Sequence, residues 1–239
     1  MTDLSASRRR ARGAKLGTAV VEYLVDDIVR GTYPTGASLP PEADLCEEFG
    51  VSRTVIRESI KVIQEKGLVR IEQGRGTSVT DPRQWNLLDD IILTTVIRHD
   101  ASLSILDELV SVRTALEAVM AADAARVASA EAHHALGAAL ATMESLRDNT
   151  PEFAAADVRF HDVVMAASGS RLGRTIVTKI HDKARTSMRY HGEYNDAVVR
   201  LTLDEHRAIY DAIVAADADA AASAMRAHIQ ESWRRRRPS

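Results

Sequence analysis

The short step Phe49-Gly50-Val51-Ser52 constrains the fold of this chain more than any other feature. Pro40-Pro41 can open a helix that ends at Gly50, because proline is tolerated in a first helical turn and glycine commonly follows a last one. Ser52 can cap the next helix, expected over 53–66. A connection of only about three to four residues makes two helices cross steeply. The sequence therefore predicts a helix-turn-helix unit.

Further elements are expected on both sides of this unit. Before it, apolar residues at helical spacing predict a first helix that stops at Gly31; they are Leu16, Val20, Leu24 and Ile28. After it, the β-prone runs 68–71 and 77–80 flank a glycine-rich turn and predict a hairpin, which in this position is a wing. Asp81-Pro82 then breaks the pattern. We expect a winged helix-turn-helix domain over 14–80 and a linker over 81–86.

The remaining residues have helical periodicity with no β-type alternation. Alanine is abundant and aromatic residues make up only 4% of the chain, which suits closely packed helices better than a β-sandwich. Helices are expected over 87–98, 103–129, 131–148, 152–168, 170–191, 202–215 and 218–236. The expected fold class is therefore mainly α, with an all-helical bundle over 87–233 after the winged domain.

Charge is unevenly distributed along the chain. The net charge is −3, yet residues 50–80 hold six Lys or Arg against three Glu. The basic N-terminus is followed by no apolar segment, so it is not a secretory signal, and no apolar run reaches the length of a membrane span. Cys46 is the single cysteine, which rules out an internal disulfide. We expect a cytoplasmic protein with no membrane partner.

The predicted second helix of the helix-turn-helix unit carries a group suited to reading DNA. Its first residues are Ser52, Arg53 and Thr54, and Arg57 follows Arg53 on the same face. In such units this part of the helix enters the major groove, where the planar fork of arginine can grip guanine. In the wing, Gly74 lets the backbone approach the minor-groove rim and Arg75 is available for contact. Taken singly, each arginine favours the simpler interpretation of a solvated surface residue.

A second group of residues, in the helical region, can hold a metal ion. Asp157 and His161 are four residues apart and share one face of a helix, while His206 and His228 lie on two later helices. A bundle can direct side chains from several helices to one interior point. Carboxylate and neutral imidazole suit zinc, nickel or manganese. The alternative is chance spacing, because a lone buried histidine is usually satisfied by a hydrogen bond. The other histidines are expected to be surface or structural residues: His99, His133, His134, His181 and His191.

Residues 14–80 resemble the DNA-binding domain of the GntR family. The motifs Leu39-Pro40-Pro41-Glu42, Phe49 to Glu58, Glu65 to Val69 and Gly74 to Val79 carry this resemblance. It implies that DNA is contacted by seven residues, namely Ser52, Arg53, Thr54, Arg57, Gln73, Gly74 and Arg75. Members often have an arginine where this chain has Ala43, so one contact is expected to be missing.

The tract 87–233 resembles the FCD effector domain of the FadR subfamily. The matching segments are the helix from Leu106 to Glu117, the motif Asp157-x-x-Phe160-His161, and the segments that begin at His206 and His228. The resemblance implies that Asp157, His161, His206 and His228 bind a divalent metal. It also implies that Arg113 reaches toward a small carboxylate effector, such as an organic or sugar acid. Many members have Gly-Asn where this chain has Gly169-Ser170, so Ser170 is expected to face a different effector.

These expectations combine into a ligand-responsive repressor that is not an enzyme. Two chains would pair through their helical domains and place two recognition helices on double-stranded operator DNA. The metal is expected to be zinc first, with nickel and manganese as alternatives. One rival is a metal-dependent hydrolase or lyase, because a site of one Asp and three His can activate water. Another is a repressor whose metal is purely structural.

Overall fold

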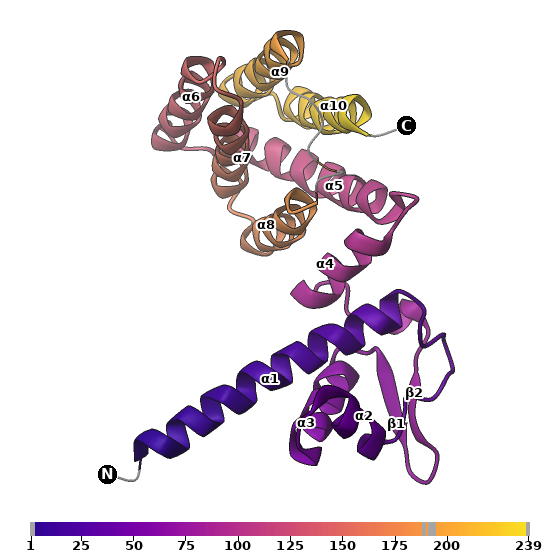
Figure 1. Cartoon of the computed structure of the whole chain (residues 1–239). Helices are drawn as coiled ribbons and strands as arrows, with labels where there is room; N and C mark the ends of the chain where they lie inside the picture. Colours follow the sequence, from indigo (N-terminus) through magenta and orange to yellow (C-terminus); the bar gives the residue numbers. More distant parts are fainter. Residues whose placement is uncertain (1–2, 188–189, 191–194, 238–239) are drawn as a thin grey trace. The chain divides into compact units, whose positions relative to one another are not determined.

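The first of two compact units contains a winged helix-turn-helix. The computed structural model describes residues 3–187, 190 and 195–237, and the units divide between Ala101 and Ser102. The first unit comprises α1 (Asp3–Val29), α2 (Glu42–Phe49), α3 (Arg53–Glu65), β1 (Val69–Glu72), β2 (Gly76–Val79), the 3-10 turn η1 (Pro82–Gln84) and α4 (Asp90–His99) (Figure 1). The second unit contains helices only within its described residues, so the expected fold class is confirmed.

Local sequence signals account for the turn and the wing. Gly50 follows α2 in the left-handed conformation with a φ of 62°, and the Ser52 hydroxyl accepts a hydrogen bond from the Val55 N–H at the start of α3. Strands β1 and β2 pair antiparallel, with Val69 opposite Val79. Both predicted devices, the glycine stop and the serine cap, are therefore present.

The first unit has a single aliphatic core. Its fully buried side chains come from α1, α2, α3 and the strand region, and include Leu24, Leu45, Ile56, Ile63 and Leu68. Ile92 of α4 belongs to the same core. Leu16, expected on the apolar face of the first helix, is 41% exposed.

Helix α4 belongs to the first unit, whereas the sequence placed the linker at 81–86 and α4 beyond it. The Asn86 N–H donates to the Lys66 carbonyl at 3.0 Å, and Lys66 forms an ion pair with Asp89. At the other end of α4, His99 Nε2 lies 2.7 Å from Asp26 Oδ1 on α1. Apolar burial and polar contacts along this segment thus attach it to the winged domain, and the units divide after it.

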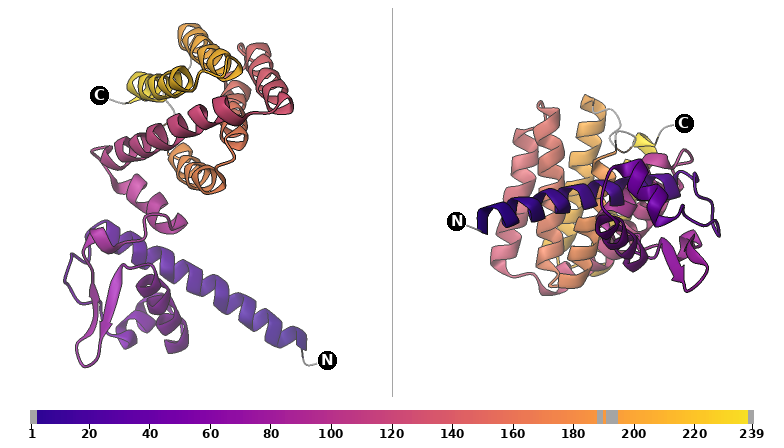
Figure 2. Two further views of the ribbon diagram at one scale, coloured as in Figure 1. Left: turned by 180° about the vertical axis from the view of Figure 1, so that it is seen from behind. Right: turned by 60° about the horizontal axis from the view of Figure 1, so that its bottom comes forward.

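The second unit is a bundle of helices, and Figure 2 shows it from two further sides. Its elements are α5 (Ser104–Val127), α6 (Ala130–Ser145), α7 (Thr150–Ala167), α8 (Arg171–Arg185), α9 (Asp196–Val214) and α10 (Ala218–Arg236). Helix α10 packs along α5 and α9, and α7 packs against α5, α6 and α8. No helix among the described residues is long and apolar enough to cross a membrane.

Two helix limits in this unit differ from the expectation by six residues. Helix α8 stops at Arg185 rather than 191, and α9 begins at Asp196 rather than 202. Asn195 explains the second difference, because its side-chain oxygen accepts hydrogen bonds from the Ala197 and Val198 N–H groups. Asparagine is a strong N-cap residue, so this signal was present in the sequence.

Candidate metal centre and nucleic-acid interface

The second unit brings the four expected metal ligands together. Asp157 and His161 lie on α7, His206 on α9 and His228 on α10. One potential ligand atom from each residue lies within 4.8 Å of all the others. The three histidines are buried, and the Asp157 side chain is 18% exposed. The bundle thus brings together four residues that lie far apart in the sequence.

The outward nitrogen of each histidine has a polar partner. His161 Nδ1 lies 2.5 Å from Glu117 Oε2, His206 Nδ1 lies 2.7 Å from the Thr202 carbonyl oxygen, and His228 Nδ1 lies 2.8 Å from Glu205 Oε2. All three partners are acceptors, so each Nδ1 carries the proton when the imidazole is neutral. The Nε2 atoms are then free to act as ligands, which is the arrangement that metal-binding histidines usually adopt.

The inner nitrogens fit a cation. His206 Nε2 is buried without a hydrogen-bond partner among the described residues, although Asp157 Oδ1 lies 3.2 Å from it without hydrogen-bond geometry. His161 Nε2 and His228 Nε2 face each other at 3.1 Å. If both imidazoles protonate Nδ1, two lone pairs meet there. A buried nitrogen without a partner is costly, and a divalent ion would satisfy all three.

The charges of these residues also suit metal binding. Burial opposes ionisation of Asp157, but the adjacent His206, His161 and His228 hold the pKa of its carboxyl well below the usual range. Burial and the nearby His206 lower the pKa of His228 to about 3. At neutral pH the centre therefore offers an ionised carboxylate and a neutral imidazole, the forms that coordinate metals.

Arg113 is linked to the centre through a residue that the sequence reasoning did not select. Its Nε donates to Glu117 Oε1 at 2.7 Å, and its Nη1 donates to the Tyr190 hydroxyl at 2.7 Å. Its Nη2 has no hydrogen-bond partner within the described part of the chain. Despite the burial of Glu117, the charges of Arg113 and His161 hold the pKa of this carboxyl below its usual range. Glu117 lies one helical turn after Arg113, and this spacing was the available signal.

A second arginine and glutamate lie behind His228. Arg235 donates to both carboxylate oxygens of Glu205, at 2.7 and 2.8 Å. Burial opposes ionisation of Glu205, but the hydrogen bonds from His228 and Arg235 lower its pKa to about 2. Arg235 belongs to the run of four arginines at 234–237, yet its side chain is only 17% exposed. No spacing rule links residue 205 to residue 235, because only the packing of α9 against α10 joins them.

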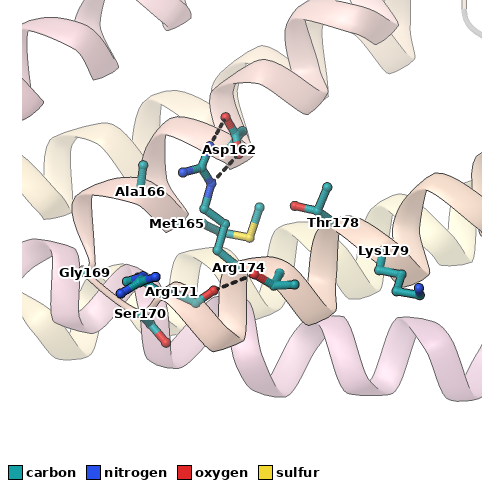
Figure 3. A pocket seen from close by; sticks show the side chains of 10 residues that line it. Asp162, Met165, Ala166, Gly169, Ser170, Arg171, Arg174, Thr178 and Lys179 are labelled. Atoms are coloured by element: carbon teal, nitrogen blue, oxygen red, sulfur yellow. Dashed lines mark hydrogen bonds and ion pairs between the residues drawn. The ribbon is translucent and has the colours of Figure 1, made fainter. Parts of the chain in front are cut away.

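Ser170, the other expected effector residue, lies in a different place. It belongs to a cavity of about 570 Å³ between α7 and α8 that is lined by none of the four expected metal ligands (Figure 3). Arg174 crosses this cavity to Asp162, with a bond of 2.8 Å from its Nε. The structure therefore does not join Ser170 to the metal centre.

Of the remaining histidines, which are expected to be surface or structural residues, His181 has a structural position. It is buried on α8, and its ring meets that of Tyr190 edge-on at a centroid distance of 5.7 Å. Burial and the nearby Arg113 hold its pKa well below the usual range, so it is neutral at physiological pH. His99 has a structural contact with Asp26, and His191 lies outside the described residues.

In the first unit, every residue expected to touch DNA is exposed. Three lie at the start of α3, a fourth follows one turn later, and three lie in the hairpin turn; they are Ser52, Arg53, Thr54, Arg57, Gln73, Gly74 and Arg75. Gly74 has a φ of 79°, and a Cβ atom there would meet nothing within 4 Å. Backbone conformation therefore accounts for this glycine, and the open space suits a close approach to a ligand.

Arg57 also has a partner within the unit. Glu42 at the start of α2 accepts hydrogen bonds from Arg57 Nε at 2.9 and 3.1 Å. The Arg57 side chain is nevertheless 70% exposed. Ala43, where an arginine was expected by resemblance, is exposed on α2 and adds no charge to this surface.

Comparisons with known proteins agree with a winged helix-turn-helix unit followed by a helical unit. Residues 16–79 match the family "Bacterial regulatory proteins, gntR family", and residues 108–231 match the FCD domain. The chain is 32% identical to the galactonate operon transcriptional repressor of Escherichia coli K12, over 90% of this chain and 94% of that protein. It is 30% identical to a fatty acid metabolism regulator protein of Cronobacter sakazakii, over 62% of this chain and 61% of the relative. The solved structure of Lar from Listeria monocytogenes has a similar fold, with a TM-score of 0.56, 18% identity and coverage of 92% and 95% of the two chains.

Proposed function

Because the chain belongs to the gntR family of bacterial regulatory proteins and carries an FCD domain, we propose that it is a repressor released from its operator by a small carboxylate. The seven exposed residues of α3 and the wing are its proposed DNA contacts. Arg53 would read a base edge from the N-terminal end of α3, and Ser52 and Thr54 would bind phosphate oxygens. Arg75 would contact the groove rim beside the wing.

We propose that Asp157, His161, His206 and His228 bind a divalent metal, zinc first. The observation that carries this proposal is the buried His206 Nε2 without a hydrogen-bond partner among the described residues, directed at three other potential ligands. When bound, the ion would supply an electrophilic position for an effector oxygen. The Nη2 of Arg113, which has no hydrogen-bond partner in the described part of the chain, is the second proposed contact for that effector.

The charge balance of the centre favours an effector with one negative charge. Three carboxylates, those of Asp157, Glu117 and Glu205, stand against two guanidinium groups, those of Arg113 and Arg235, which gives −1 with neutral imidazoles. A divalent ion changes this sum to +1. A buried net charge is unfavourable unless it is paired, so a monocarboxylate would neutralise the loaded site. D-Galactonate, suggested by the name of one relative, carries one carboxylate and is the first effector to test.

We also propose that two chains pair through α5 and α8. These helices pack together and expose apolar side chains, of which Val112 is 43%, Val119 60% and Leu172 72% exposed. Exposed apolar patches mark association surfaces. A second copy is the fitting partner, because a near-palindromic operator requires two recognition helices related by a twofold axis.

A DNA selection followed by effector titration tests the function. Duplexes that bind the full chain are selected from a random library, and binding of the selected duplex is measured by fluorescence anisotropy with zinc-loaded and metal-free protein. D-Galactonate should weaken binding by about 5- to 150-fold, and only when zinc is bound. Equal release without metal would support a purely structural ion. Failure to select any sequence would contradict the DNA-binding proposal.

A further inference from the structure

Two of the three histidines in the proposed metal centre are backed by the same kind of side-chain relay. In the first relay, Arg113 donates to Glu117, which accepts from His161. In the second, Arg235 donates to Glu205, which accepts from His228. The helices α5 and α7 form the first relay, and α9 and α10 form the second. None of the four glutamate and arginine side chains is itself among the proposed ligands.

We propose that Glu117 and Glu205 are positioning residues, each anchored by an arginine and each holding one histidine with its Nε2 lone pair toward the metal. This inference rests on the proposed metal centre and goes beyond it by assigning the residues that orient the ligands. A neutral imidazole has one N–H, and an ionised carboxylate can only accept. Each glutamate therefore places the proton on Nδ1 and leaves Nε2 as the donor atom for a metal.

Without a cation, this orientation is unfavourable. The Nε2 atoms of His161 and His228 lie 3.1 Å apart, so two lone pairs face each other at hydrogen-bond distance. Rotating one ring, or moving its proton from Nδ1 to Nε2, would relieve the conflict, but would break the hydrogen bond to the carboxylate behind it. The relays thus keep the donor atoms ready at some cost to the metal-free protein, and bound metal removes that cost.

The two relays differ in burial, which gives the inference a quantitative consequence. The Glu117 side chain is 0% exposed and Arg113 is 5% exposed, whereas the values for Glu205 and Arg235 are 22% and 17%. Water can partly replace the carboxylate of Glu205 but cannot easily reach His161 behind Glu117. We therefore expect the buried relay to contribute more to metal binding.

The third histidine provides an internal reference. His206 Nδ1 donates to the carbonyl of Thr202, four residues earlier on the same helix. Neither Glu117 nor Glu205 takes part in this hydrogen bond, whose acceptor belongs to the backbone of α9. It should remain unchanged when either glutamate is replaced, so a variant loses the support of one ligand at a time.

The test compares Glu117→Gln and Glu205→Gln in the full chain. Glutamine keeps the size of the side chain but replaces one acceptor oxygen by an NH₂ donor, so it cannot accept from both histidine and arginine as the carboxylate does. Glu231→Gln is the matched control, because Glu231 forms only an exposed pair with Arg234 on α10. Zinc affinity is measured by competition with a chromophoric chelator. The absorption spectrum of the cobalt-loaded protein reports on the coordination geometry.

We expect zinc affinity to fall by about 10- to 100-fold, more for Glu117→Gln than for Glu205→Gln, with a changed cobalt spectrum and no change in the control. A thermal melt of metal-free protein shows whether each variant is folded. If Glu117→Gln does not fold, Glu205→Gln decides the outcome. Folded variants with wild-type zinc affinity and an unchanged cobalt spectrum would contradict the positioning role of the two glutamates. That outcome would leave the proposed metal centre intact. Absence of zinc binding in the wild type would overturn the metal centre itself.

Discussion

At the scale of single residues, conformation and surroundings together decide what a position tolerates. Gly67 and Gly31 have nearly the same positive φ, 84° and 85°. A Cβ atom at Gly67 would lie 2.3 Å from the Gln84 carbonyl oxygen, whereas one at Gly31 would meet nothing within 4 Å. The sequence shows both as ordinary helix stops, and only the fold separates them.

This pair gives a stability prediction. Gly31→Ala should cost about 1 kcal/mol, because only the left-handed conformation is penalised. Gly67→Ala should cost about 2 kcal/mol more, because the backbone of residue 84 must also move. Urea unfolding of both variants measures the difference. Equal losses in the free energy of unfolding would show that the backbone at residues 66–85 can shift without further cost.

Arg53 is the residue on which the DNA-reading proposal depends most. It is exposed at the first turn of α3 and has no ion pair among the described residues that would restrain it. Arg53→Glu should weaken binding of the selected duplex by about 100-fold or more, because a base contact is lost and a phosphate is repelled. Zinc content should be unchanged. Arg147→Glu, exposed in the second unit, is the control with the same charge change, and an equal loss there would mean that only net charge was measured.

At the scale of elements, caps decide where the helices of the site begin. Helix α9 starts six residues before its expected limit of 202, because the Asn195 cap was overlooked. The middle of this helix, around residues 202–206, carries Glu205 and His206 to the proposed centre. The other helices with proposed metal ligands, α7 and α10, have limits within two residues of the expectation.

Removal of this cap should destabilise the second unit. Asn195→Ala deprives the Ala197 and Val198 N–H groups of their acceptor and should cost about 1 kcal/mol. Arg200→Ala, exposed on the same helix, should change the free energy of unfolding by less than about 0.5 kcal/mol. Thermal melts of the two variants test the assignment. Indistinguishable melts would mean that the first turn of α9 is stabilised by packing alone.

At the scale of the whole molecule, the proposed pairing of two chains gives a prediction. Val119→Glu combined with Leu172→Glu should yield monomers in light scattering, because charges on the α5–α8 patch would be buried without partners. Duplex affinity should then fall by about tenfold or more as one of two half-site contacts is lost. Leu201→Glu, at a position on α9 that is 49% exposed, is the control. A dimeric double variant would place the interface elsewhere.

The sequence by itself determined the elements whose signals are local. The glycine stop, the serine cap and the glycine-rich turn lie within a few residues of what they control, so the winged helix-turn-helix and its exposed residues could be predicted. The pairing of Asp157 with His161 followed from one helical turn, but their convergence with His206 and His228 was carried by family resemblance. Spacing alone could not establish it.

Only the tertiary structure decided how distant segments combine. It placed α4 with the winged domain, because Ile92 is buried in that core. It separated Ser170 from the proposed metal centre. It brought Glu117 and Arg235 to that centre through contacts between helices, which no periodicity encodes. Burial explains the contacts of these charged residues, because a carboxylate removed from water needs hydrogen-bond donors from the protein. The neighbouring guanidinium and imidazole groups supply those donors.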